Sequence, residues 1–149
     1  MKKVICILIT LIFAVSLVAC GSKTVDGYKL DLGKSKLYSE EERKACIPLI
    51  MEKFNGFVDK CTMISISYAG DEEFNDENMM RANDISYDED KTDYDQCIVF
   101  VCDFKTPPKT NGNLQSNKVY KNFRWLLGRR KTADNKYSDW EIVIYGLAE

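Results

Sequence analysis

The sequence predicts an α+β domain, in which a kinked N-terminal helix and a short second helix pack on one face of a curved, four-stranded antiparallel sheet. Residues 39–58 carry apolar side chains at helical spacing, and four later segments show the alternating or continuous apolar pattern of strands. The last three of these segments are separated by loops alone. This order of elements is typical of an α+β domain rather than of an alternating α/β one.

Residues 1–19 have the pattern of a cleaved signal peptide. Lys2 and Lys3 precede an apolar run over residues 4–18, and small residues follow before Gly21. The run is too short to cross a membrane, because a stable transmembrane helix needs about 20 apolar residues. A positive start, a short apolar run and a small-residue exit indicate an exported chain. An uncleaved membrane helix and a signal removed further on are the alternatives.

The end of the apolar run, Leu17-Val18-Ala19-Cys20, resembles a bacterial lipobox. The resemblance implies that a diacylglyceryl group is attached to the thiol of Cys20, which becomes the new N-terminus. Acyl chains such as palmitate then anchor the protein, since each buried CH₂ contributes about 0.8 kcal/mol. We therefore expect a lipoprotein on the extracytoplasmic face of the cell membrane, with the lipid anchor as its membrane contact.

Composition limits what the exported part can do. Residues 20–36 mix Gly, Ser, Lys and Asp without an apolar period and are expected to form a lipidated flexible tether, which leaves 37–149 as the domain. Removal of two lysines with the signal takes the net charge from −2 to −4, which argues against a nucleic-acid partner. The chain has no histidine, so histidine general bases and histidine-containing metal sites are excluded.

The long helix has a clear start in the sequence. Ser39 and Glu42 form a capping box, in which each side chain accepts a hydrogen bond from the backbone N–H of the other residue. Pro48 is expected to kink the helix, because proline removes one main-chain hydrogen bond. The apolar stripe expected to face the sheet consists of Cys46, Ile47, Ile50, Met51, Phe54 and Phe57.

The first strand and the short helix follow. Residues 62–68 alternate as a half-buried strand does, with Ile64 on the same face as Ile66 and Tyr68. Residues 73–85 predict the short helix within an acidic segment. The apolar side chains of this helix that are expected to turn inward are Phe74, Met79, Met80 and Ala82.

The three C-terminal strands are expected over residues 96–104, 119–129 and 140–145. The first is apolar on both faces between Ile98 and Cys102, as in a strand that is covered on both sides. The second is expected to place one set of side chains on a common face: Val119, Phe123, Trp125 and Leu127.

Several local motifs resemble those of small bacterial lipoproteins from anaerobic Gram-positive species, and the order of elements resembles the cone-shaped nuclear-transport-factor-two-like, or cystatin-like, architecture. The motifs are Leu37-Tyr38-Ser39-Glu40-Glu41, Cys61 with Ile64-Ser65-Ile66-Ser67-Tyr68-Ala69-Gly70-Asp71, Tyr94-Asp95-Gln96-Cys97-Ile98-Val99-Phe100, Trp125-Leu126-Leu127-Gly128-Arg129, and Trp140-Glu141. The resemblance implies a fold and an address but no activity.

A cone fold keeps a pocket on the concave face of its sheet, so aromatic side chains on the strands are candidate pocket residues. The alternative is that these side chains are ordinary core. The candidates are Tyr68, Phe100, Phe104, Trp125, Trp140 and Tyr145.

Three other groups of residues are weighed for chemistry. The domain cysteines, Cys46, Cys61, Cys97 and Cys102, either act as buried thiols or include a Cys46–Cys61 or Cys61–Cys97 disulfide. The acidic side chains of Asp84, Asp88, Asp90 and Asp93 either hold Ca²⁺ or form a solvated loop. The basic set either faces anionic lipid or wall polymer or covers a strand pair, and consists of Lys118, Lys121, Arg124, Arg129, Arg130 and Lys131.

These observations predict a non-catalytic module that binds a small ligand or a surface protein, with no cofactor, no metal and no catalytic residue. One alternative is a small hydrolase or isomerase that works with the carboxylates of Asp71, Asp95 or Asp103, which would require a raised pKa in a dry pocket. The other is an interaction protein of the immunity or inhibitor type, for which a flat charged surface is expected.

Overall fold

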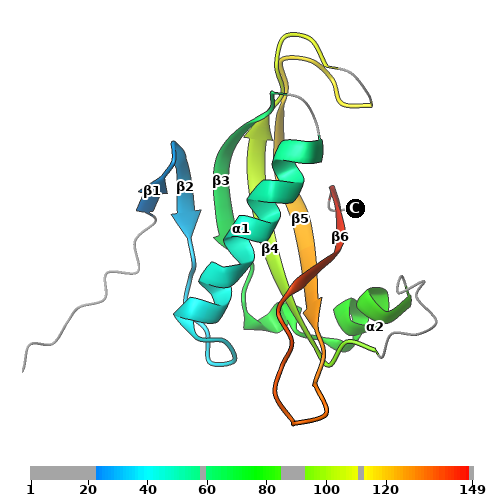
Figure 1. Cartoon of the computed structure of the whole chain (residues 1–149). Coiled ribbons are helices and arrows are strands. Elements are labelled where there is room, and N and C mark those ends of the chain that lie inside the picture. Colours follow the sequence, from blue (N-terminus) through cyan, green and yellow to red (C-terminus); the bar gives the residue numbers. More distant parts are fainter. Residues whose placement is uncertain (1–22, 58–59, 85–92, 111–112, 148–149) are drawn as a thin grey trace, which may run out of the picture.

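The computed structural model describes residues 23–57, 60–84, 93–110 and 113–147. Within them, six strands form one sheet in the order β1-β2-β3-β4-β5-β6 (Figure 1). The elements are β1 (Lys23–Val25), β2 (Tyr28–Asp31), α1 (Glu40–Phe57), β3 (Thr62–Tyr68), a 3-10 turn η1 (Asp71–Glu73), α2 (Asp76–Asp84), β4 (Gln96–Lys105), β5 (Val119–Arg129) and β6 (Glu141–Leu147). The predicted α+β class is confirmed. No helix in these ranges is long and apolar enough to span a membrane.

The predicted four-stranded antiparallel sheet is wrong, because two further strands lie in the segment that was expected to be a tether. Strands β1 and β2 form a hairpin, and β2 then pairs parallel with β3 after the chain has crossed through α1. Asp26 and Gly27 make the turn with φ values of 46° and 89°. An Asp-Gly pair favours such a two-residue hairpin. Tyr28 is 5% exposed and belongs to the core, which holds the hairpin on the domain.

Helix α1 begins with the predicted capping box. The N–H of Glu42 donates to Ser39 Oγ at 3.1 Å, and the N–H of Ser39 donates to Glu42 Oε2 at 2.7 Å. The helix runs from Glu40 to Phe57 as one element with Pro48 inside it, so the predicted kink is not confirmed.

The two helices cover opposite faces of the sheet, which corrects the prediction that both lie on one face. Along β4, Ile98 and Phe100 pack in the core beneath α1, whereas Cys97 and Val99 pack with Ala82 of α2. The continuous apolar run in β4 therefore faces two cores, as predicted for a strand that is covered on both sides. Only part of the inward set predicted for the short helix is buried, since Met80 of α2 is exposed, and Phe74 is exposed and lies before α2 begins.

Two irregularities reverse which side chains face the core. The pairing of β3 with β4 shifts between Met63 and Ser65, so Met63 is buried while Ile64 is 37% exposed. In β5, Asn122 has a φ of 55°, and its N–H donates to Asp103 Oδ1 at 3.0 Å. As a result Tyr120 is buried, and Val119, which was predicted to face inward, is exposed.

Candidate functional site

Five of the six aromatic residues predicted as candidates for a pocket lie in the core. Tyr68, Phe100, Phe104, Trp125 and Trp140 are all at most 9% exposed in the cluster beneath α1. The sixth candidate, Tyr145, lines a hollow. The physical reason is that α1 packs directly onto the face where these side chains project.

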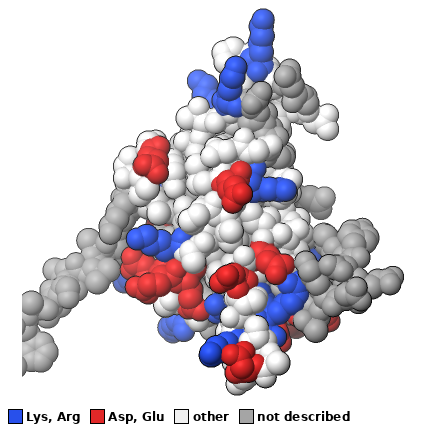
Figure 2. Space-filling view, viewed as in Figure 1, with Lys and Arg blue, Asp and Glu red and all other residues white. Residues whose placement is uncertain are grey.

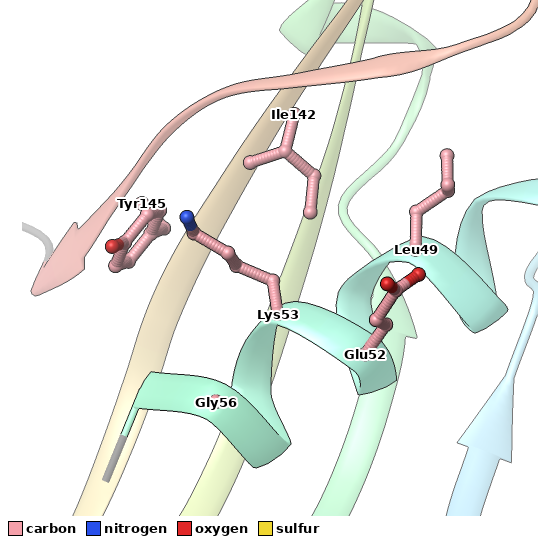
Figure 3. Close-up of a pocket in the computed structure, with 6 residues that line it drawn as sticks. All are labelled: Leu49, Glu52, Lys53, Gly56, Ile142 and Tyr145. Carbon is pink, nitrogen blue, oxygen red and sulfur yellow. The ribbon is translucent and has the colours of Figure 1, made fainter.

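The first hollow lies between the C-terminal half of α1 and β6, and we call it the α1–β6 hollow (Figure 3). It has a volume of about 480 Å³. The side chain of Lys53 extends from α1 toward Tyr145, with Nζ 5.5 Å from the centroid of the tyrosine ring (Figure 3). The residues that line it are Leu49, Glu52, Lys53, Gly56, Ile142 and Tyr145.

The floor of this hollow is fixed by a stacked aromatic pair. The ring of Tyr145 lies on the indole of Trp125, with centroids 5.1 Å apart and ring planes 22° apart. Trp125 is fully buried, so Tyr145 rests on a rigid surface. The hollow combines apolar walls with one ammonium group and one carboxylate from α1, which suits an apolar side chain with polar neighbours.

The second hollow lies on the opposite face of β6, against α2, and we call it the α2–β6 hollow. It has a volume of about 580 Å³. Its most buried charges are paired, since Arg124 Nη2 lies 2.7 Å from Glu73 Oε2, which also accepts a hydrogen bond from Asn78 at 2.8 Å. The lining residues are Glu73, Asn75, Glu77, Asn78, Arg81, Arg124, Leu126, Ile144, Gly146 and Leu147. The lining of this hollow is more polar than that of the first.

Strand β6 separates the two hollows and forms one edge of the sheet. Within the described ranges β6 pairs with β5 alone. Beyond a register shift in that pairing, Tyr145 lines the α1–β6 hollow, and Ile144 and Gly146 line the α2–β6 hollow. An edge strand with a hollow on each side is the most distinctive surface feature of the described domain.

The basic set does not form a common cationic face, because its three arginines serve the fold. Arg129 is paired with Glu42 at 2.7 Å, and its guanidinium lies 4.3 Å from the centroid of the Trp140 ring. Arg130 is paired with Glu141 at 2.9 Å. Arg124 holds Glu73 in the α2–β6 hollow, as described above. These pairs connect helices, loops and strands rather than offering free charge.

Lysines occupy the opposite end of the molecule. Figure 2 shows only Lys and Arg among the charged side chains at the upper end, where Figure 1 places the connection between β4 and β5. Lys105, Lys109 and Lys118 belong to or flank this connection. Of these three lysines, only Lys118 belongs to the basic set, for which a contact with anionic lipid or wall polymer stays a prediction.

The carboxylates proposed for an enzyme are engaged in holding the backbone. Burial raises the pKa of Asp71, but hydrogen bonds from Ser35, from the Lys36 N–H and from Tyr68 outweigh it and leave the pKa below its ordinary value of 3.8. Asp95 accepts from the N–H of Lys131 at 2.6 Å, and Asp103 accepts from Asn122. A lowered pKa at Asp71 is the reverse of what a general acid at neutral pH requires.

The four domain cysteines are free thiols in the described structure. Burial raises the pKa of Cys97 and that of Cys102 to about 11, and it raises the pKa of Cys46 to about 12, so these thiols are protonated at neutral pH. Of the acidic residues considered for Ca²⁺, Asp88 and Asp90 lie outside the described residues. Among those that are described, no group of three or more Cys, Asp or Glu side chains is arranged to hold a metal.

Acid is expected to destabilise the domain through two paired glutamates. At Glu42, burial raises the pKa, but the Ser39 N–H and Arg129 outweigh it and leave the pKa below its ordinary value of 4.5. At Glu73, the hydrogen bond from Arg124 is the main cause of a lowered pKa. As the pH falls, the two glutamates therefore take up protons in the unfolded chain before they do so in the folded one. Their contribution to stability is complete above their pKa values in the unfolded chain, and it is lost as the pH drops through their lower pKa values in the folded chain.

The measurement is the urea midpoint at pH 7 and at pH 3, which should be lower at pH 3. Glu42→Gln removes one of the two groups and should reduce the difference between the two midpoints. Equal midpoints at both pH values would contradict this prediction.

No protein-family model, curated protein or solved structure matches the chain. The cone-fold and lipoprotein resemblances therefore stay predictions.

Proposed function

We propose that this protein is a membrane-anchored extracytoplasmic lipoprotein whose domain is a non-catalytic binding module, with β6 and its two flanking hollows as the binding surface. The observation that carries the binding role is that one edge strand borders both the α1–β6 hollow and the α2–β6 hollow. A concave site with mixed apolar and polar walls is the usual form of a binding site.

The two alternatives have less support. Asp71 is held by three hydrogen bonds and has a lowered pKa, so it does not act as the buried acid of a carboxylate enzyme. An inhibitor-type protein was expected to offer a flat charged surface, whereas the domain has two hollows along one edge. The site therefore favours a module that receives part of another molecule.

The membrane anchor is tested by Cys20→Ala. We expect this variant to lose labelling by radioactive palmitate and to leave the membrane fraction, because the acyl chains supply the anchoring energy. Cys6→Ala is the matched control, since it removes the other cysteine of the signal segment and should keep both properties. The proposed lipidation would be overturned if Cys20→Ala stayed fully in the membrane fraction and if palmitate labelled neither variant.

A further inference from the structure

We propose that β6 accepts an extended segment of a partner protein as a seventh strand of the sheet, whose side chains enter the two hollows alternately. The inference rests on the proposed binding function and names the class of partner. It follows from three features of the described structure: the chemistry of the β6 edge, the positions of the hollows, and their unlike linings.

The first feature is an edge that lacks the usual protection. An edge strand presents a row of backbone N–H and C=O groups, and natural proteins guard such rows with charged residues, prolines or a covering segment. Residues 142–147 of β6 include neither a charged residue nor a proline. Leu147 is 53% exposed, and the rest of the strand is partly exposed. The edge thus favours pairing with another strand.

The second feature is the placement of the hollows on both faces at the same edge. Successive side chains of a strand point to opposite faces of the sheet. A strand laid beside residues 144–147 would therefore direct one side chain into the α1–β6 hollow and the next into the α2–β6 hollow. Strand addition combines main-chain hydrogen bonds with pockets for alternate side chains in just this way.

The third feature is that the linings differ. Ile142, Leu49 and the ring of Tyr145 give the α1–β6 hollow apolar walls. The Arg124–Glu73 ion pair and Asn78 give the α2–β6 hollow hydrogen-bonding groups. The segment that fits both alternates apolar residues with polar ones, as a half-buried strand does.

A second copy of β6 fits this edge poorly. Ile142 and Tyr145 face one side of the sheet, and Val143 and Ile144 pack on the other, so β6 is apolar on both faces. Paired with itself, it would bring apolar side chains to the polar lining of the α2–β6 hollow, whose hydrogen-bonding groups would lose water without gaining a new hydrogen bond. The strand that fits this edge therefore belongs to a different protein.

Two glycines allow each hollow to be filled without disturbing the fold. A Cβ built at Gly56, in the α1–β6 hollow, or at Gly146, in the α2–β6 hollow, meets no atom within 4 Å, and neither residue has a positive φ. Gly56→Leu and Gly146→Leu should therefore fold normally and occupy the space that a ligand side chain needs. Lys109→Leu adds the same side chain at an exposed position away from β6 and is the matched control.

The probe is a displayed library of random peptides of about ten residues, which is long enough for one strand. The library is selected against the full chain in detergent micelles, so the outcome does not depend on how the chain is anchored. We expect the selected peptides to alternate apolar and polar residues. Gly56→Leu and Gly146→Leu should each weaken their binding at least about tenfold, whereas Lys109→Leu should leave it unchanged.

Backbone N-methylation of a selected peptide tests the strand itself. Methyl groups on alternate amides should each weaken binding about tenfold, because they remove the N–H groups that pair with β6, while those on the intervening amides should have little effect. Loss of affinity in the glycine variants without this alternation would overturn strand addition and leave the proposed binding surface standing. Selection of no peptide, affinity unchanged in both glycine variants, or a dimer that Gly146→Leu dissolves would also overturn it.

Discussion

Replacement of Trp125 by alanine is expected to lower the free energy of unfolding by about 3–5 kcal/mol, as for other large aromatic side chains removed from a core. The indole is fully buried, and its ring centroid lies 5.5 Å from that of Phe123 and 5.1 Å from that of Tyr145. Its N–H points at Cys102 Sγ, 3.2 Å away. Alanine would leave a cavity that these neighbours fill only in part.

The same substitution should also damage the α1–β6 hollow, because Tyr145 loses the surface on which it stacks. Urea denaturation followed by circular dichroism measures the stability, and binding of a selected peptide measures the hollow. Trp125→Phe keeps an aromatic surface under Tyr145 and is the control, which should lose less of both. An alanine variant as stable as the wild type would contradict the assignment of Trp125 to the core.

Replacement of Arg129 by alanine is expected to have the second large effect. It should lower the free energy of unfolding by about 2–3 kcal/mol. Removal of one partner from a fully buried ion pair costs about 3–5 kcal/mol. The expected cost of Arg129→Ala is lower, because the Glu42 side chain is 35% exposed and keeps some hydration. Gln96 Oε1 also loses the N–H that Arg129 Nε donates at 2.8 Å, and Trp140 loses a guanidinium 4.3 Å from its ring centroid.

Arg129→Lys separates charge from shape, since lysine keeps the positive charge but lacks the planar group that stacks on Trp140 and reaches both acceptors. It should fall between the wild type and the alanine variant in urea denaturation. A double-mutant cycle with Glu42→Gln then isolates the ion pair. If Arg129→Ala costs under about 0.5 kcal/mol, as a surface substitution does, Arg129 is not a link between α1 and β5.

Long periodic segments were predictable from the sequence. Strand β3 has the predicted limits, and α1, β4 and β5 lie within one residue of them, because each has a cap or a sustained apolar pattern. Strands β1 and β2 were missed, since they have three and four residues and so show too little periodicity to be recognised. Their signals were local: the Asp26-Gly27 turn and the spacing of Tyr28 and Leu30.

The candidate site was harder to predict. Aromatic residues at a two-residue spacing identify a covered face, but the spacing does not distinguish a pocket from the packing surface of a helix. The prediction therefore placed core residues such as Phe100 and Trp125 among the candidates for a pocket, together with Tyr145, which lines one. That β6 is an edge follows from the strand order, which depends on long-range pairing and leaves no mark in the strand's own sequence.

The early start of β1 has a mechanical consequence for a chain acylated at Cys20. Lys23 is three residues beyond Cys20, a separation that spans at most about 11 Å. In such a chain, this short connection would keep the β1 side of the domain next to the lipid headgroups. Five strand spacings of about 4.8 Å separate β1 from β6, so the sheet is a spacer about 24 Å wide. It would present β6 to the surroundings on the side away from the bilayer.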